Sequence, residues 1–265
     1  MARSKKSFDR ILSMYRFKDL VFRSTKVPVL KQLGRLAMPP REMTLTYVPV
    51  CEDIELPEGT VAPISVIEHF INEASDHLIL SRCPCRSGNG CEVAPIDFGC
   101  TFLGPAVRTV DPEVGRRVSR AEALEHLREA TEMGLVSCVG VFKGDAIMLG
   151  VKEHKKLVTV CHCCTCCCIS TSMPLASREM RDVLKKMEGV RVEVTDDCNG
   201  CGLCVPSCIF GQVRIDDGRA VIGDECKGCG RCAAACKRKA VRVTVDNPDY
   251  IQQCIDRINT LVDVN

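Results

Sequence analysis

The sequence predicts an α+β protein in which a small cysteine-rich α+β domain precedes a compact duplicated unit. The first observation behind this prediction is that 21 of the 265 residues are cysteine. The second is that eight of these cysteines form two runs of identical spacing near the carboxyl end, offset by 28 residues. The third is that segments with helical and with strand-like periodicity are mixed through the rest of the chain.

The duplicated unit is defined by its two cysteine runs. Both have the spacing C-x2-C-x2-C-x3-C, and they consist of Cys198, Cys201, Cys204 and Cys208, then Cys226, Cys229, Cys232 and Cys236. The repeat also relates residues between and beyond the thiols, namely Asp196 and Asp224, Gly200 and Gly228, Gly202 and Gly230, and Val213-Arg214 and Val241-Arg242. A duplication of this length predicts two copies of one small unit packed against each other.

The spacing within each run suits an iron–sulfur cluster. Thiolates two residues apart wrap a tight loop around one corner of a cube, and glycine relieves the positive-φ strain of that loop. Zinc sites are built more often from separated cysteine pairs, so the spacing favours clusters over zinc. Residues 191–246 resemble a bacterial-type two-[4Fe-4S] ferredoxin domain, although Ile209 and Lys237 stand where that family usually has proline.

The resemblance implies a crossed set of ligands. In proteins of this kind the fourth cysteine of each run binds the cluster of the other run. The first cluster is therefore expected on Cys198, Cys201, Cys204 and Cys236, and the second on Cys226, Cys229, Cys232 and Cys208. The implied fold is a ferredoxin-like dicluster domain attached to the cysteine-rich domain.

Composition and charge limit the functional classes. A net charge of +2 with 26% charged residues gives no reason to expect nucleic-acid binding. The first ten residues lack the apolar core of a secretory signal, and no apolar run approaches the length of a membrane span. We therefore expect a cytoplasmic protein without a transmembrane segment, whose thiols bind metal rather than form a disulfide scaffold.

Residues 1–50 are predicted to form a basic N-terminal arm. Ten Lys or Arg and two Asp precede Arg41, and apolar residues from Phe8 to Phe22 recur at helical spacing. One interpretation is an amphipathic arm that lies on an acidic partner or on a membrane surface. The other is a helix that packs on its own domain, and the interleaving of charged and apolar positions favours this second interpretation.

Residues 51–190 are predicted to form the cysteine-rich α+β domain. Ser119 and Glu122 predict a capping box at the start of a helix that Gly134 ends. The other elements expected in or next to this domain are strands at 44–50, 77–81 and 156–160, a helix at 66–74, a β-hairpin at 135–151 and a helix at 172–187. A strand at 190–194 then enters the duplicated unit, and residues 247–265 are expected to close the chain with a helix.

The cysteine-rich domain carries candidates for a third cluster. Six of the eight residues from Cys161 to Cys168 are cysteine, and a cubane has only four corners, so a subset must combine with other thiols. The candidates are Cys83, Cys85, Cys91, Cys161, Cys163 and Cys164. A fourth cluster, a structural zinc ion and disulfides between adjacent thiols are the alternatives. The isolated Cys51, Cys138 and Cys254 are expected to be buried in the core.

These features predict an iron–sulfur electron-transfer protein, either a ferredoxin-type carrier or a subunit of an anaerobic redox enzyme, with redox proteins as partners. The sequence contains no P-loop, dinucleotide or His-Glu metal motif. The alternative is an oxidoreductase whose N-terminal cluster reacts with substrate, similar to disulfide reductases of the heterodisulfide-reductase type. This chain lacks their Cys-Cys-Gly motif. A third hypothesis is a structural or regulatory protein that depends on its metal.

Overall fold

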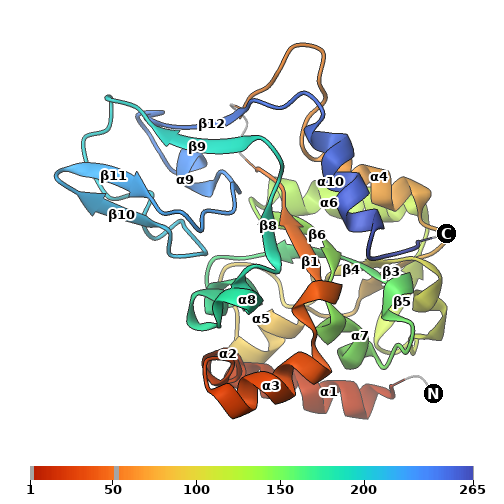
Figure 1. The fold of residues 1–265 in the computed structure, drawn as a ribbon. Coiled ribbons are helices and arrows are strands. Elements are labelled where there is room, and N and C mark those ends of the chain that lie inside the picture. The colour runs from red at the N-terminus through yellow and green to blue at the C-terminus, as the bar shows by residue number, and fades with distance from the viewer. Residues whose placement is uncertain (1–2, 51–53, 265) are drawn as a thin grey trace.

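The computed structural model describes residues 3–50 and 54–264, and it confirms a mixed α+β fold (Figure 1). The larger part is built on a seven-stranded sheet of order β5-β3-β4-β7-β6-β1-β8. Its neighbouring strands are antiparallel except β1 and β8, which are parallel. The strands are β1 (Thr44–Tyr47), β3 (His77–Leu80), β4 (Thr101–Leu103), β5 (Gly115–Val118), β6 (Val136–Val141), β7 (Val158–Cys163) and β8 (Leu184–Lys186).

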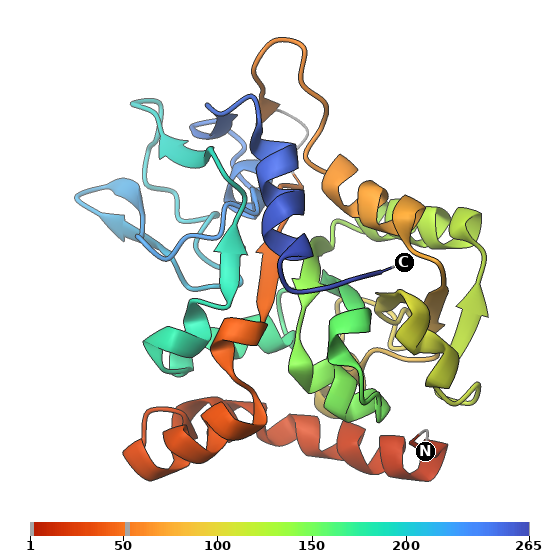
Figure 2. The ribbon, with the colours of Figure 1, turned by 45° about the vertical axis from the view of Figure 1, so that its right-hand side comes forward.

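One face of this sheet packs against three helices, α4 (Ser65–Glu73), α6 (Arg120–Glu132) and α10 (Tyr250–Asn259). The predicted capping box starts α6, since Ser119 Oγ accepts the Glu122 N–H while the Glu122 carboxylate accepts the Ser119 N–H. The helix that closes the chain forms as expected and lies beside α4 (Figure 2). Cys254 is buried in this core, as predicted.

Residue alternation along the central strands decides which side chains face the helices. Val139 of β6 and Val160 of β7 belong to the core beneath α4, α6 and α10. Cys138, Cys161 and Cys163 belong to packing clusters on the opposite side of the sheet. Because successive strand side chains point to opposite faces, these thiols are all presented to the same side.

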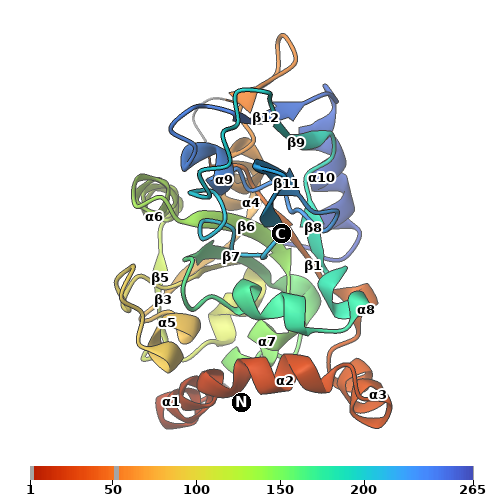
Figure 3. The same ribbon diagram turned by 90° about the vertical axis from the view of Figure 1, so that its left-hand side faces the viewer.

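The N-terminal arm contributes three helices along one edge of the molecule (Figures 1 and 3). Phe8 and Leu12 of α1 and Phe22 of α2 are buried, so the interpretation of an arm that packs on its own domain is confirmed for these two helices. The segment predicted as an arm also includes β1, which lies inside the seven-stranded sheet. The bounds of the helices are α1 (Lys5–Met14), α2 (Lys18–Ser24) and α3 (Pro28–Ala37).

The carboxyl-terminal unit projects from the main sheet (Figure 1). It holds a two-stranded sheet of β10 and β11, and a three-stranded sheet in which β12 pairs with both β9 and β2. A short helix, α9, follows the first cysteines of the second run. These elements are β2 (Ile54–Glu55), β9 (Val190–Val194), β10 (Val213–Asp216), β11 (Arg219–Ile222), α9 (Arg231–Ala234) and β12 (Val241–Val245).

Two predicted elements are wrong. The hairpin expected at 135–151 is strand β6 followed by helix α7 (Lys143–Leu149), which ends at Gly150 with φ of +74°. A short apolar run suits a helix as well as a strand, and here the helix packs Met148 and Leu149 into the core next to α1. The helix expected at 172–187 is divided into a 3₁₀ turn containing Pro174, a helical turn and strand β8, because Leu184 pairs with Leu45.

The remaining helical segments are short. They are α5 (Pro84–Asn89) and α8 (Arg178–Arg181), and the 3₁₀ turns Tyr15–Phe17, Pro40–Glu42, Pro105–Thr109, His154–Lys156 and Ile169–Leu175. None of the helices within 3–50 and 54–264 combines the length and the apolar character needed to cross a bilayer. Cys51 lies outside the described residues.

Candidate metal centres

The eight thiols of the duplicated unit are sorted into two groups, and each group mixes the two runs. Cys198, Cys201 and Cys204 line a cavity together with Cys236, which comes from the second run. Cys208 of the first run lies instead among Cys226, Cys229 and Cys232, close enough to influence their titration. The two groups are the same crossed sets that the ferredoxin resemblance implies.

Glycine geometry gives the two loops the same shape. Gly200 and its repeat partner Gly228 have φ of +67° and +69°, in the left-handed region that favours glycine. A Cβ atom at Gly200 would lie 2.3 Å from the carbonyl oxygen of Gly218. The first loop therefore approaches the β10–β11 turn too closely for any other residue without a shift.

Backbone N–H groups point at the fourth cysteine of each run. Gln212 N lies 3.2 Å from Cys208 Sγ, and Ala240 N, its repeat partner, lies 3.3 Å from Cys236 Sγ. Cys198 Sγ likewise accepts from Ala220 N at 3.3 Å, and this bond lowers its pKa. Hydrogen bonds of this kind stabilise a thiolate and tune the potential of a bound cluster.

Burial differs between the two groups. Desolvation raises the pKa of Cys229 to about 12, so its free thiolate is disfavoured at neutral pH. Val50 N donates to the Cys229 carbonyl at 3.0 Å, which ties the second loop to the segment that follows β1. The second group therefore lies at the junction with the main domain, whereas Cys201 of the first group is exposed.

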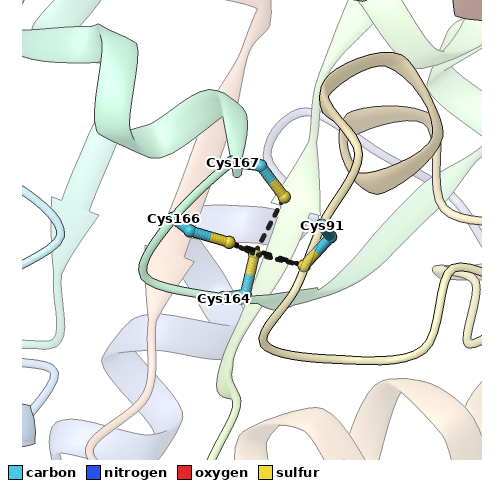
Figure 4. Close-up of side chains that lie close together, drawn as sticks. All are labelled: Cys91, Cys164, Cys166 and Cys167. Carbon is cyan, nitrogen blue, oxygen red and sulfur yellow. Dashed lines mark hydrogen bonds between the residues drawn. The ribbon is translucent and has the colours of Figure 1, made fainter.

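The N-terminal cysteines form two further groups, of which the first has four members. Cys91 meets three thiols of the cysteine-rich run, Cys164, Cys166 and Cys167 (Figure 4). All four sulfurs lie within 4.8 Å of one another, and four of the separations are 3.9, 3.4, 3.7 and 3.1 Å. A hydrogen bond from Cys167 lowers the pKa of Cys164 to about 4, which favours its metal-binding thiolate form.

The sulfur–sulfur separations in this group distinguish a site for one metal ion from a site for a cubane cluster. Four thiolates at about 2.3 Å from a tetrahedral ion lie about 3.8 Å from each other. Thiolates on a cubane bind different irons and lie further apart. We refer to Cys91, Cys164, Cys166 and Cys167 as the four-thiol group, and its geometry is that of a mononuclear site.

The second N-terminal group is a closed ring of thiols. Each sulfur interacts with the next, in the order Cys83, Cys100, Cys161, Cys138, Cys163, Cys168, Cys85 and back to Cys83. We call these residues the seven-thiol ring, and all of them line one cavity. Hydrogen bonds from Cys100 and then Cys85 lower the pKa of Cys83 to about 3.

The sheet positions the ring. Cys138 of β6 lies opposite Cys161 of β7, and Cys163 follows two residues later on the same face. Cys83 and Cys85 lie at the start of α5, and Cys100 immediately precedes β4. Loops and strands distant in sequence thus converge on one side of the sheet.

The structure divides the six predicted N-terminal ligands between two places. Cys83, Cys85, Cys161 and Cys163 belong to the ring, whereas Cys91 and Cys164 belong to the four-thiol group. The residues named as candidates for a third cluster therefore lie in two thiol groups rather than in one. The prediction omitted Cys100, Cys138, Cys166, Cys167 and Cys168.

Cys138 shows how the omission arose. It is buried as predicted, but its sulfur lies between those of Cys161 and Cys163 rather than only among apolar side chains. The pairing of β6 with β7 brings these sulfurs together, because it places Cys138 directly opposite Cys161. The expected hairpin at 135–151 concealed that pairing.

Comparison with known proteins adds no assignment: no family model, curated protein or solved structure matches the chain. The grouping of the thiols is therefore the main basis for a functional interpretation. The described cysteines lie close together in a manner compatible with metal binding, and the four-thiol group is a candidate site.

Proposed function

We propose that this protein is an iron–sulfur electron-transfer protein, a ferredoxin-type carrier or the electron-transfer subunit of an anaerobic redox enzyme. The observation that supports the proposal most strongly is the crossed sorting of eight thiols into two sets of four. Two cubanes held in this way accept and release single electrons, and the protein sets their potentials through burial and N–H···S bonds.

The four-thiol group adds a second component to the proposal. Its sulfur separations fit one tetrahedral divalent ion, zinc or iron, which would join the loop at Cys91 to the run beginning at Cys161. Such an ion would fasten together two segments that are 73 residues apart at Cys91 and Cys164. Its role would be structural, since all four positions are occupied by protein thiolates.

Iron and sulfide analysis with EPR tests the electron-transfer proposal. After anaerobic reconstitution, the two C-terminal clusters are expected to contribute about eight irons per chain and reducible EPR signals. The double variant Cys198→Ala/Cys226→Ala removes one ligand from each set and is expected to lose the signals of intact [4Fe-4S] clusters. Cys254→Ala, at a buried thiol outside all four groups, is the matched control.

Two results would contradict the proposal. One is a parent protein that binds no iron after reconstitution while it remains folded. The other is a double variant whose reducible signals equal those of the Cys254→Ala control.

A further inference from the structure

The seven-thiol ring has more thiols than a cubane has corners. None of its thiols belongs to the four-thiol group, whose four sulfurs would satisfy one tetrahedral ion, although Cys164 of that group also lines the cavity. Cys83, Cys100, Cys138, Cys163 and Cys168 are at most 8% exposed. Thiols at this depth can pack as apolar groups, but their closure into a ring around one cavity is typical of ligands around a cofactor.

A buried cation beside the ring indicates negative charge there. The Arg86 side chain lines the same cavity and is 1% exposed. Its guanidinium donates to the carbonyls of Phe98 at 2.6 Å and His162 at 2.7 Å. Within 3–50 and 54–264 no carboxylate forms an ion pair with it. A buried charge without a counter-charge is costly, and the thiols that face Arg86 are Cys83 and Cys100 of the ring and Cys164 of the four-thiol group. Thiolates bound to metal at these positions would compensate the charge.

A buried donor without a partner lies beside the ring. Arg86 lines the cavity, and its Nε is buried and has no hydrogen-bond partner among the described residues. An inorganic sulfide is an acceptor of the kind that this N–H lacks. His162 and Thr101 are neighbours of ring cysteines in the sequence, but strand alternation turns their side chains to the other face of the sheet.

We propose that the seven-thiol ring binds a polynuclear iron–sulfur cluster with more than four thiolate ligands, separate from the single ion of the four-thiol group. Arg86 compensates the negative charge of this cluster, and its Nε–H donates a hydrogen bond to one of the sulfides. The cluster would be the third in the chain, and it does not depend on the two C-terminal clusters for its ligands.

Side-chain contacts connect the ring with the second C-terminal group. The Tyr47 hydroxyl bonds Ser170 Oγ, which lies 3.4 Å from Cys168 Sγ and 3.7 Å from Cys163 Sγ. The Tyr47 ring contacts the ring of Phe210 edge-to-face, with 4.8 Å between the ring centroids. Phe210 lies two residues after Cys208. This contact route would let the ring cluster exchange single electrons with the dicluster unit. That role in electron exchange rests on the proposed function, whereas the cluster itself does not.

The test compares metal content in the full-length chain after anaerobic reconstitution. If the ring binds a cluster, the parent holds at least about twelve irons per chain rather than about eight. Cys138→Ala/Cys163→Ala is expected to lose at least about four irons while it keeps the C-terminal EPR signals. Cys254→Ala controls for removal of a buried thiol, and Cys166→Ala should lose a single ion.

Each outcome decides the proposal. A parent with only about eight irons overturns it without any variant, and so does a ring variant with unchanged iron. If the ring variant does not fold, the iron content of the parent decides. Should the C-terminal clusters be absent, a parent with about four irons that the ring variant lacks would support the ring cluster and refute the proposed function.

A different observation concerns helix α3, whose polar side faces the protein. Lys31 and Arg35 both pair with Glu179 of α8. The apolar side is turned to solvent, where Val29 is 70%, Leu33 59% and Leu36 78% exposed. An amphipathic helix normally buries its apolar side, so this inverted orientation marks a docking surface.

Positive charge identifies the occupant of this surface. Leu20 and Val21 of α2 are also exposed and add to the apolar side chains of α3. Arg23 and Lys26, both exposed, lie between Val21 and α3 in the sequence. The three N-terminal helices occupy one edge of the molecule, away from the carboxyl-terminal unit (Figure 3). We infer that this face lies on an anionic lipid surface, with its leucines in the headgroup boundary.

Vesicle sedimentation tests this inference. The full-length protein is expected to bind phosphatidylglycerol-containing vesicles but not pure phosphatidylcholine, and added salt should weaken the binding. Leu33→Gln/Leu36→Gln is expected to reduce binding at least about tenfold, because two leucines that would enter the lipid are lost. Val61→Gln, at another exposed apolar residue, is the control. Absence of binding to the anionic vesicles overturns the inference. The inference also fails if the protein binds no vesicles but forms a dimer that the double variant does not form.

Discussion

Combining Cys208→Ala with Cys226→Ala is expected to destroy one cluster and leave the other intact, although the two cysteines belong to different runs. The reason is that Cys208 lies among Cys226, Cys229 and Cys232. Both substitutions then remove ligands from the same cluster. Iron content should fall by about four per chain, and the EPR signal of one complete [4Fe-4S] cluster should remain.

The matched variant is Cys208→Ala combined with Cys198→Ala. These cysteines share a run but belong to different groups, so each cluster loses one ligand. No complete [4Fe-4S] signal is expected from the C-terminal unit. The opposite pattern, with one cluster intact here and none in the first variant, would mean that each run holds its own cluster.

Removal of the metals is expected to unfold the C-terminal unit before the main domain. Its own core contains only five buried hydrophobic residues, and two of them are Cys204 and Cys232. Without metal these thiols provide little apolar packing, so folding of the unit and metal binding are expected to be coupled. Protection of the β10 and β11 amides from hydrogen exchange should fall at least about a hundredfold, which corresponds to roughly 3 kcal/mol.

Helix α4 serves as the internal control for this experiment. Its residues Ile67, Phe70 and Ile71 are fully buried in the large core, on the face of the main sheet opposite the seven-thiol ring. We therefore expect the exchange of α4 amides to change much less when the metals are removed. Equal protection of β10 and β11 with and without metal would show that this unit folds on its apolar contacts alone.

Local signals predicted several elements correctly. The capping box at Ser119 and Glu122 depends only on residues three apart, and the structure forms it. The strand at β9 and the helices α4 and α10 follow from the periodicity of their apolar residues. The hairpin at 135–151 failed because a short apolar run does not distinguish strand from helix, and α7 forms where α1 covers it.

The sequence by itself determined the pattern of the eight C-terminal thiols, because their ligand spacing and the Gly200 and Gly228 turns are local properties of each repeat. Their binding of two clusters stays a prediction. Only the tertiary structure decided how the N-terminal thiols divide, because β6–β7 pairing and the approach of the Cys91 loop join residues far apart in sequence. No spacing rule relates Cys138 to Cys83, since the folded sheet alone brings them to one cavity.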